Sequence, residues 1–308
     1  MKKQILYLST FVLLVTISSC KKGPDEPTTN GNEMAAHTED QSRFSAEMDA
    51  VANDANLAIE SSTSFTGRLQ DIQGLICDAT IDVNSATNPM TVTITYSGTN
   101  CLNGRIRTGV VVLSMEQGTQ WKNAGAVISA SFQNLKITRI ADGKSITING
   151  TQLYTNESGG LLVNLATAGT ITHTIVSPGL SIKFDNGSQR DWQVAKRRVF
   201  TYNHGAVITT TGMHVDSSSL HIAEWGTNRF GGEFTTSTTA PIVVRQDCNF
   251  RITSGAILHT TSAATATVTF GLDVTGAPTS CPGVGGHYYY KLIWSGANGA
   301  SFGLILPY

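Results

Sequence analysis

Two stretches of the chain alternate between apolar and hydroxyl-bearing side chains. In residues 90–96 apolar side chains occupy the even positions and threonine the odd ones, and residues 264–272 repeat this pattern with one glycine among the threonines. Because successive side chains of a strand point to opposite faces, this period of two predicts strands with one buried and one solvent-facing side. Further strands are predicted at 106–115, 126–139, 145–156, 160–175, 179–185, 191–202, 206–223, 228–236, 241–258, 287–295 and 301–306.

Turn signals separate many of these segments. Asn-Gly and Asp-Gly pairs provide the positive φ that tight hairpin turns need. The pairs are Asn103-Gly104, Asp142-Gly143, Asn186-Gly187 and Asn298-Gly299. Asn149-Gly150 is expected to be either a turn or a bulge inside a strand. No helical segments alternate with the strands, so the pattern predicts a mainly β protein, built as a large antiparallel meander in one twisted sheet or a sandwich.

One segment instead shows a helical period. Over residues 39–60 apolar side chains recur every three or four positions, which predicts an amphipathic helix packed on the sheet. The stripe consists of Phe44, Met48, Val51, Ala55 and Ile59. Thr38 and Gln41 fit a capping box and place the expected helix start at Thr38. Residues 38–308 are therefore predicted to form a single β-rich domain with one N-terminal helix.

The N-terminus carries an export signal. Two lysines at positions 2 and 3 precede an apolar run from Ile5 to Ile17, and two serines then precede Cys20. A bilayer span needs about 20 apolar residues, whereas the apolar part of a signal peptide has about 7–15. Residues 1–19 are thus interpreted as a lipoprotein signal peptide, with Cys20 palmitoylated or otherwise acylated after cleavage. A cleaved signal with another cut site is the alternative.

This signal predicts that the protein is located in the cell envelope. Acyl chains on Cys20 anchor the protein to a membrane, because each buried methylene contributes about 0.8 kcal/mol. Lys21, in place of the aspartate that retains lipoproteins on the inner membrane, favours the outer membrane, on either its periplasmic or its surface face. Residues 20–37 are rich in proline, glycine and polar side chains, and are predicted to form a flexible tether.

Composition narrows the range of partners. Charged residues make up 14 % of the chain and the formal net charge is −1. Polarity comes mainly from threonine, serine and asparagine, which suits the outer faces of strands. A balanced, weakly charged surface lacks the basic face that binds phosphate backbones. No nucleic-acid partner is expected.

Four cysteines remain beside Cys20. An even number outside the cytoplasm predicts disulfides, for which three pairings are available. We favour Cys77–Cys101 and Cys248–Cys281, because each closes a local loop of a similar kind. The rival is a four-thiolate metal site, but no Cys-x-x-Cys pair supports it. Each cysteine pair accompanies a Thr-rich strand, which predicts two similar disulfide-closed units or, alternatively, convergent β patterning.

One segment carries a family resemblance. Residues 96–109 run Tyr-Ser-Gly-Thr-Asn-Cys-Leu-Asn-Gly-Arg-Ile-Arg-Thr-Gly, and they resemble a turn of uncharacterised β-rich lipoproteins of Bacteroidota. Gly150-Thr151 and Gly226-Thr227-Asn228-Arg229 are similar to later segments of those proteins. The resemblance covers most of 77–290 and departs in the C-terminal cysteine region. It implies a β-rich surface or periplasmic lipoprotein and brings no catalytic residues.

The candidate catalytic motifs each lack residues that their chemistry requires. Gly299-Ala300-Ser301-Phe302-Gly303 matches a nucleophile elbow, but neither a following helix nor a downstream Asp and His exists. Gly143-Lys144-Ser145 lacks the first glycine of a phosphate loop. Asp185 with Asp191 is explained by a hairpin turn, and His204, His214, His221 and His259 show no paired spacing for a metal. No catalytic residue, metal site or cofactor is predicted.

The remaining candidates concern binding. Trp192, Trp225, Arg229 and Phe230 are the best candidates for a carbohydrate platform, because aromatic faces stack on sugars. The basic run Lys196-Arg197-Arg198 is expected on an edge strand with alternating sides, and an anionic sugar or lipid head group is its alternative ligand.

Three functions follow from these candidates. The first is a non-enzymatic lipoprotein that binds a glycan or protein partner or has a structural role in the envelope. The second is a periplasmic carrier of hydrophobic molecules, and the third is an extracytoplasmic hydrolase. A cavity between helix and sheet favours the carrier, an exposed row of Trp and Tyr favours glycan binding, and two facing carboxylates in a cleft favour the hydrolase.

Overall fold

The computed structural model describes residues 29–62, 65, 76–101, 104–217, 219–283, 286–296 and 299–308. The predicted signal peptide, Cys20 and the first part of the tether lie outside these residues. The helical elements are α1 (Thr29–Ser61), α3 (Leu165–Ala168) and the 3-10 turns η1 (Leu162–Asn164) and η2 (Gln246–Cys248). The strands are β1 (Ala79–Asn84), β2 (Met90–Ser97), β3 (Arg105–Met115), β4 (Ala126–Arg139), β5 (Ser145–Asn156), β6 (Thr170–Phe184), β7 (Gln189–Tyr202), β8 (Ala206–Gly212), β9 (Ile222–Thr227), β10 (Glu233–Arg245), β11 (Arg251–Thr261), β12 (Ala264–Leu272), β13 (Tyr289–Gly296) and β14 (Ser301–Pro307).

The strands form a single antiparallel sheet, which confirms the predicted mainly β meander. Neighbours in the sheet follow chain order from β1 to β8 and from β10 to β14. Two short strands, β8 and β9, lie between β7 and β10. Strand β8 pairs with the C-terminal parts of β7 and β10, and β9 pairs with their N-terminal parts. Gly226 allows β9 to approach β7 closely, since a Cβ there would lie 2.2 Å from the carbonyl oxygen of Asp191.

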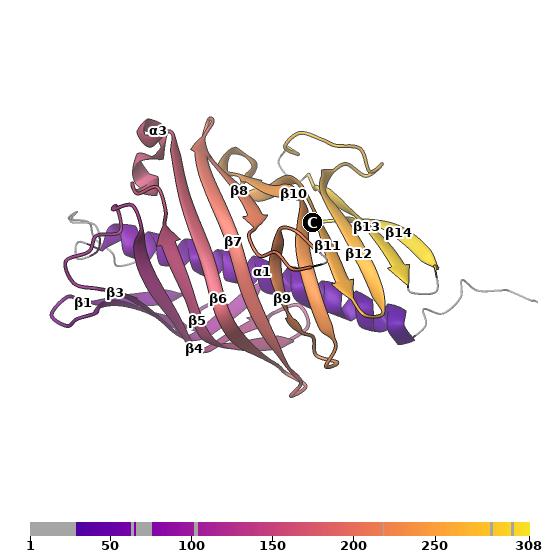
Figure 1. Ribbon diagram of the computed structural model, residues 1–308, viewed down its shortest axis with the longest axis horizontal. Coiled ribbons are helices and arrows are strands. Elements are labelled where there is room, and N and C mark those ends of the chain that lie inside the picture. Colours follow the sequence, from indigo (N-terminus) through magenta and orange to yellow (C-terminus); the bar gives the residue numbers. More distant parts are fainter. Residues whose placement is uncertain are drawn as a thin grey trace, which may run out of the picture.

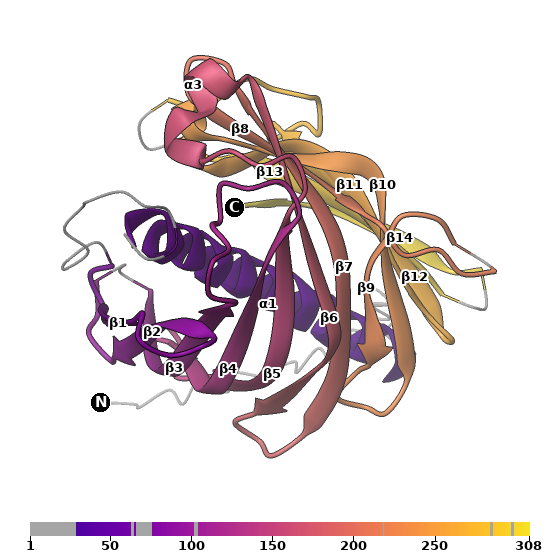
Figure 2. The same cartoon turned by 60° about the vertical axis from the view of Figure 1, so that its left-hand side comes forward.

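The sheet curls around α1, which crosses its concave face from the C-terminal strands to the N-terminal ones (Figures 1 and 2). The predicted apolar stripe of the helix faces the sheet, and each of its five residues is at most 3 % exposed. These residues join one large core with the inward side chains of strands β1 to β7 and β10. The predicted packing of the helix on the sheet is therefore confirmed.

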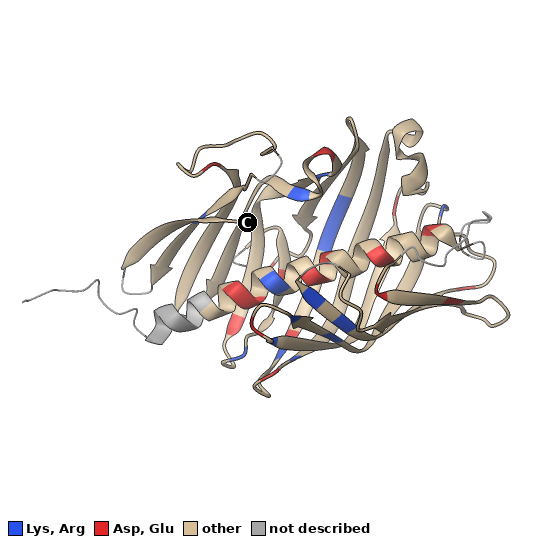
Figure 3. Ribbon diagram, turned by 180° about the vertical axis from the view of Figure 1, so that it is seen from behind, with Lys and Arg blue, Asp and Glu red and all other residues tan. Residues whose placement is uncertain are grey.

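Charge also joins the helix to the sheet. Figure 3 shows acidic residues along α1 beside basic residues of the strands. Each of four α1 carboxylates pairs with an arginine from the sheet or its loops: Glu39 with Arg139, Asp40 with Arg229, Glu47 with Arg105, and Asp54 with Arg107. Arg107 also contacts Asp78 at 2.6 Å, and both side chains are almost fully buried. Because breaking a buried pair leaves an uncompensated charge, the Arg107–Asp54 contact favours one register of the helix on the sheet.

The helix begins earlier than expected. It starts at Thr29, so Thr38 lies inside it and the predicted capping box is wrong. Residues 29–37 of the predicted tether are helical, while residues 20–28 lie outside the described residues. His37 packs against Phe234 with ring centroids 4.8 Å apart, and this tertiary contact comes from a residue that local propensity could not reveal.

Several strand boundaries also differ. Residues 162–168 are helical, and β6 then runs through the two segments predicted at 160–175 and 179–185. The segment predicted at 241–258 is split by η2, where Asn249 and Phe250 adopt positive φ and reverse the chain. Asn149-Gly150 lies within β5. The split of 241–258 arose because apolar periodicity does not report a turn that interrupts a run of strand-forming residues. At Pro178-Gly179 the reverse happened, because β6 continues through a pair that predicted a break.

Both predicted disulfides are confirmed. Cys77 pairs with Cys101 and Cys248 with Cys281, with Cα atoms 5.9 and 5.4 Å apart. Each joins the two ends of a hairpin, β1–β2 in the first case and β11–β12 in the second. Asp247 lies near Cys248 and Cys281. These two cysteines are bonded to each other and therefore offer no thiolate to a metal. The equivalent placement of the two disulfides agrees with the repeat of Thr-rich strands in the sequence.

Candidate functional site

A cavity of about 160 Å³ lies between α1 and the strands β7 to β12. One wall is apolar and the other is polar. The apolar wall comes from Ile242, Val244, Ile252, Ile257 and Phe270. The polar wall comes from Gln41, Ser45, Asp49, Lys196, Arg198, Glu224 and His259. The cavity therefore suits a molecule with an apolar and a polar part.

The polar wall is organised around Glu224 on β9. Its carboxylate forms an ion pair with Lys196 and accepts a hydrogen bond from the hydroxyl of Ser45 on α1. The indole nitrogen of Trp192 donates to the other carboxylate oxygen at 3.2 Å. Burial opposes the charge of Lys196, but Glu224 and Asp49 outweigh it and raise the pKa of the ammonium group. Lys196 is thus a buried, charged group with a fixed partner.

Arg198, two positions along β7, has weaker partners. Its guanidinium donates to Asn53 on α1 at 3.3 Å and lies 5.5 Å from the ring centroid of Phe200. Among the residues that the structure describes, no carboxylate lies within ion-pair distance of Arg198. Its side chain is nevertheless buried, with the residue 4 % exposed. The polar wall therefore holds two cations, Lys196 and Arg198, and two carboxylates, Glu224 and Asp49, and the guanidinium of Arg198 has no direct ion pair within the described residues.

Arg190 lies deeper on the same strand face. Its guanidinium is placed between two aromatic rings, 4.9 Å from the centroid of Phe44 and 5.4 Å from that of Phe234. The residue is 1 % exposed, and within the described ranges none of its three side-chain nitrogens has a hydrogen-bond partner. Burial lowers the pKa of Arg190 to about 10, while Glu224 and Asp40 act in the opposite direction.

Three further polar side chains are buried in this region. His37 and Gln41 lie one turn apart on α1, and His259 lies on β11. The rings of His37 and His259 are 6.0 Å apart. Nδ1 of His259 shares a hydrogen bond with the hydroxyl of Thr236 at 2.8 Å. Its Nε2, both ring nitrogens of His37 and both amide atoms of Gln41 have no hydrogen-bond partner in the part of the chain that the structure describes.

Burial keeps both imidazoles neutral. It lowers the pKa of His37 to about 3, helped by His259 and Arg190, and the pKa of His259 to about 4, helped by Arg190. A neutral imidazole has one N–H donor and one acceptor nitrogen. Arg190, His37, Gln41 and His259, called here the Arg190 cluster, therefore offer several donors near the cavity.

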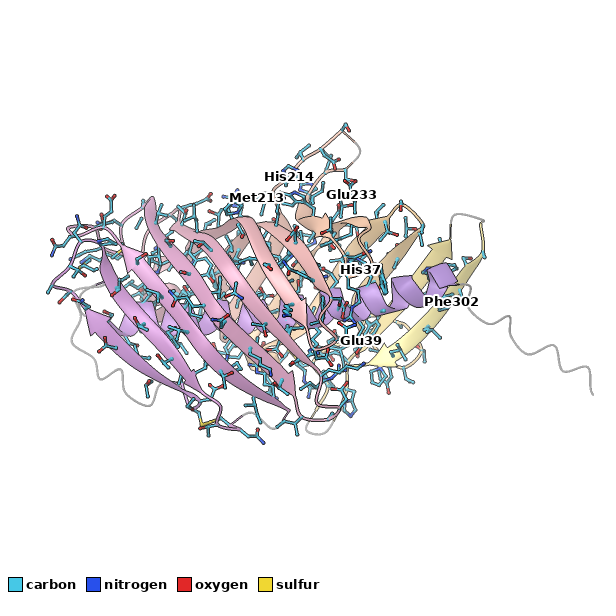
Figure 4. All side chains as sticks on the ribbon, turned by 90° about the horizontal axis from the view of Figure 1, so that it is seen from below. His37, Glu39, Met213, His214, Glu233 and Phe302 are labelled. Atoms are coloured by element: carbon cyan, nitrogen blue, oxygen red, sulfur yellow. A yellow bond between two sulfur atoms is a disulfide. The ribbon has the colours of Figure 1, made fainter. Side chains whose placement is uncertain are left out.

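The residues predicted as a carbohydrate platform are not brought together on one surface. Trp192 is fully buried against Phe44, with ring centroids 3.8 Å apart, and its face is not available to a sugar. Trp225 pairs with the neighbouring Gln193 and thus points to the opposite face of the sheet. There it stacks on His214 with centroids 4.1 Å apart, away from α1 (Figure 4).

Arg229 and Phe230 follow β9 at the rim. Arg229 binds Asp40 on α1 through both carboxylate oxygens, at 2.6 and 2.5 Å, and its guanidinium lies 3.9 Å from the ring centroid of Phe184. Phe230 is 47 % exposed in the adjoining turn. Arg229 therefore connects the helix to the turn after β9, and Phe230 presents a largely free ring.

The prediction of an edge strand for Lys196-Arg197-Arg198 is wrong. Strand β7 pairs with β6 on one side and with β8 and β9 on the other. Lys196 and Arg198 point inward to the cavity, whereas Arg197 points outward and lies 3.4 Å from Glu157. The error arose because a charged run on a strand was attributed to solvent, although the helix opposite supplies buried polar partners.

The sequence did not single out Arg190, His37 or Glu224, and it suggested only a helix-capping role for Gln41. A signal for Arg190 exists, since it shares the even positions of residues 189–202 with Trp192, Val194 and Phe200. No comparable signal marks Glu224, because its role depends on β9 pairing with β7 out of chain order.

No protein-family model, curated protein or solved structure matches the chain. Within the described residues, no helix is both long enough and apolar enough to cross a bilayer. Function is therefore inferred from the chemistry of the cavity.

Proposed function

We propose that this protein is an envelope lipoprotein that carries an amphiphilic molecule, whose apolar chain lies between α1 and the C-terminal half of the sheet. The observation that carries this proposal is the apolar wall of the cavity. Ile257 on this wall pairs with Val268, Val268 pairs with Leu292, and Leu292 pairs with Leu304. Because directly paired residues of antiparallel strands share a face, these side chains form an apolar row from the cavity to the last strand.

The row is open at its end. A parallel row runs from Ala266 through Trp294 to Phe302, and Phe302 and Leu304 are 42 and 45 % exposed. Figure 4 places Phe302 at the end of the sheet near the N-terminal end of α1. Ligand pockets usually have about 300–1,000 Å³, so a cavity of about 160 Å³ encloses only part of a lipid-sized molecule. The remainder follows the row and displaces the contacts that cover Val268, which is 2 % exposed.

The proposed anchor lies at the same end. Eight residues separate Cys20 from Thr29, and eight extended residues reach at most about 29 Å. Acyl chains on Cys20 therefore hold the N-terminal end of α1, and the open end of the row, close to the membrane. A ligand leaving the membrane meets Phe302 and Leu304 first. The outer membrane is the address that Lys21 favours.

Other functions have less support. Trp121 and Trp192 are fully buried and Trp294 is 9 % exposed, so these rings do not form the exposed row that a glycan platform needs. Asp49 and Glu224 line the same cavity, but Glu224 is bound to Lys196, Ser45 and Trp192 and is not free to act as a base. A hydrolase therefore gains no support from this pair of carboxylates.

Displacement of an uncharged fluorescent naphthylamine from the purified full-length chain tests the carrier. The wild type is expected to bind the dye saturably and to release it when 1-hexadecanol is added. Ile257→Asn places an amide on the apolar wall and is expected to weaken dye binding about tenfold. Leu258→Asn is the matched control, because the neighbouring side chain points to the other face of β11. Equal losses in both variants, or no saturable binding by the wild type, would contradict the proposal.

A further inference from the structure

The Arg190 cluster contains more buried donors than the described residues can satisfy. Buried polar groups in folded proteins almost always have a hydrogen-bond partner, and an unpaired buried charge costs several kcal/mol. Here three nitrogens of Arg190, two of His37, one of His259 and the amide of Gln41 have none within the described ranges. All four residues are at most 1 % exposed. So many unpaired, buried N–H groups in one place point to a ligand that accepts hydrogen bonds.

The charge balance points to an anion. The carboxylates that influence Arg190 are Glu224 and Asp40. Glu224 is already paired with Lys196, and Asp40 accepts two hydrogen bonds from Arg229. Arg190 is left as a cation without a partner of its own among the described residues. One negative charge would balance it.

The cluster also adjoins the proposed ligand. Gln41 and His259 line the cavity directly, and Arg190 and His37 lie behind them, around the ring of Phe234. A planar guanidinium matches the two oxygens of a carboxylate, and such charge-assisted hydrogen bonds are stronger than neutral ones. Neutral imidazole and amide N–H groups complete a set of donors for one small acidic group.

We propose that Arg190, together with His37, Gln41 and His259, binds the carboxylate head of the amphiphile whose chain lies on the apolar row. The assignment rests on the proposed carrier function and adds the class of its ligand, a long-chain carboxylic acid. The head enters the buried cluster while the chain follows the row from Ile257 to Leu304.

The test compares two probes of equal chain length on the full-length protein. Hexadecanoic acid is expected to bind at least tenfold more tightly than 1-hexadecanol. Arg190→Met is expected to abolish this preference while leaving the affinity for the alcohol unchanged. Because methionine fills the same space without a charge, the variant is also expected to melt at a higher temperature than the wild type without ligand. Such a gain is common when a residue serves binding and not stability.

Arg105→Met is the matched control. It removes the partner of Glu47 on α1, so it is expected to lower the melting temperature and to keep the preference for the acid. Inorganic phosphate and acetate are added alone as further probes, to separate a lipid head group from a free anion.

The outcomes are distinguishable. If neither hexadecanoic acid nor 1-hexadecanol binds, the carrier function itself fails. Equal binding of both would overturn the carboxylate site and leave the carrier standing. A rise in melting temperature with phosphate or acetate alone, without a preference for the acid, would assign the cluster to a free anion instead. An Arg190→Met variant that melts lower and still prefers the acid would make Arg190 a structural residue.

Discussion

Individual inward positions of β7 decide the character of the interior. Trp192, Val194 and Phe200 build apolar core on this strand, while Arg190, Lys196 and Arg198 share their face. Placing three cations beside a core is costly unless each finds a partner. Lys196 has Glu224 and Arg198 has Asn53, which leaves Arg190 as the residue that most requires a ligand.

Buried histidines make stability depend on pH. Burial lowers the pKa of His173 to about 3, with help from Arg198, and similar effects act on His37 and His259. Since the unfolded chain binds protons near pH 6.5 and the folded chain does not, the free energy of unfolding falls as the pH drops from about 6.5 toward 4. Each histidine is expected to cost about 2 kcal/mol between pH 7 and pH 5.

His173→Leu tests this expectation. The variant lacks one titrating group, so its loss of unfolding free energy between pH 7 and pH 5 is expected to be about 2 kcal/mol smaller than that of the wild type. Urea unfolding at both pH values measures the difference. His204→Asn is the control, because His204 is exposed and adopts a positive φ that asparagine tolerates. A drop in His173→Leu equal to that of the wild type would show that this histidine is not held neutral.

At the residue scale the sequence predicted the strand at 191–202 but not which of its side chains face inward, because Trp192 was assigned to an exposed platform and is buried. The two-residue period around Trp192 was readable, and so was the basic run at 196–198. The assignment of that run to an edge failed because the partners of Lys196 and Arg198 come from α1 and β9. No local pattern states which distant element will lie opposite a charged side chain.

At the scale of elements, the last strand is exposed along its whole length. Every residue of β14 is exposed, including three apolar ones on the face that continues the cavity wall. Those residues are Phe302, Leu304 and Leu306. An exposed apolar face on an edge strand invites unwanted pairing, so its presence requires a reason. The proposed ligand chain supplies one.

Substitutions at two adjacent residues of β14 distinguish binding on the apolar row from non-specific hydrophobic binding. Leu304→Ser is expected to weaken binding of hexadecanoic acid about tenfold, because it removes apolar area that the chain would cover. Ile305→Ser changes the neighbouring residue on the opposite face and is expected to leave the affinity unchanged. Octanoic acid, which is too short to reach β14 from the cavity, should bind both variants equally. A similar loss in both variants with hexadecanoic acid would contradict the apolar row.

Element prediction was strongest where one face is buried along a whole strand. Strands β2 and β12 begin and end close to the predicted bounds, because most of the side chains on their apolar sides are buried. Prediction was weakest around η2 and at the start of α1. There the decisive facts are a left-handed turn at Asn249 and the contact of His37 with Phe234. Both depend on packing between segments far apart in the sequence.

At the scale of the whole molecule, the proposed lipid anchor and the exposed end of the apolar row lie at the same end. Figure 1 shows the N-terminal end of α1 on the same side of the molecule as β12 to β14. The lipid that we predict on Cys20 would therefore orient the body as well as retain it. The orientation directs the open end of the apolar row toward the bilayer.

Cys20→Ser tests this arrangement. Without the thiol, acylation is expected to be lost, and the chain should move from the membrane fraction to the soluble fraction of the cell envelope. Mass spectrometry of the N-terminal peptide measures the modification. The purified variant should keep its affinity for hexadecanoic acid, since no residue of the cavity changes. An unmodified Cys20 in the wild type, or an unchanged membrane fraction for the variant, would refute the predicted anchor.

The position of α1 at the beginning of the chain also affects how the protein is made. Its apolar stripe is synthesised first, yet His37 on the same helix meets Phe234 and His259 only after about 200 further residues. Contacts of such large sequence separation form late and slowly. The apolar stripe of α1 is therefore exposed during most of the synthesis of the chain. Exposed apolar surface of this kind makes the nascent chain prone to aggregation. A chaperone that shields this helix until the last strands arrive would raise the yield of native protein.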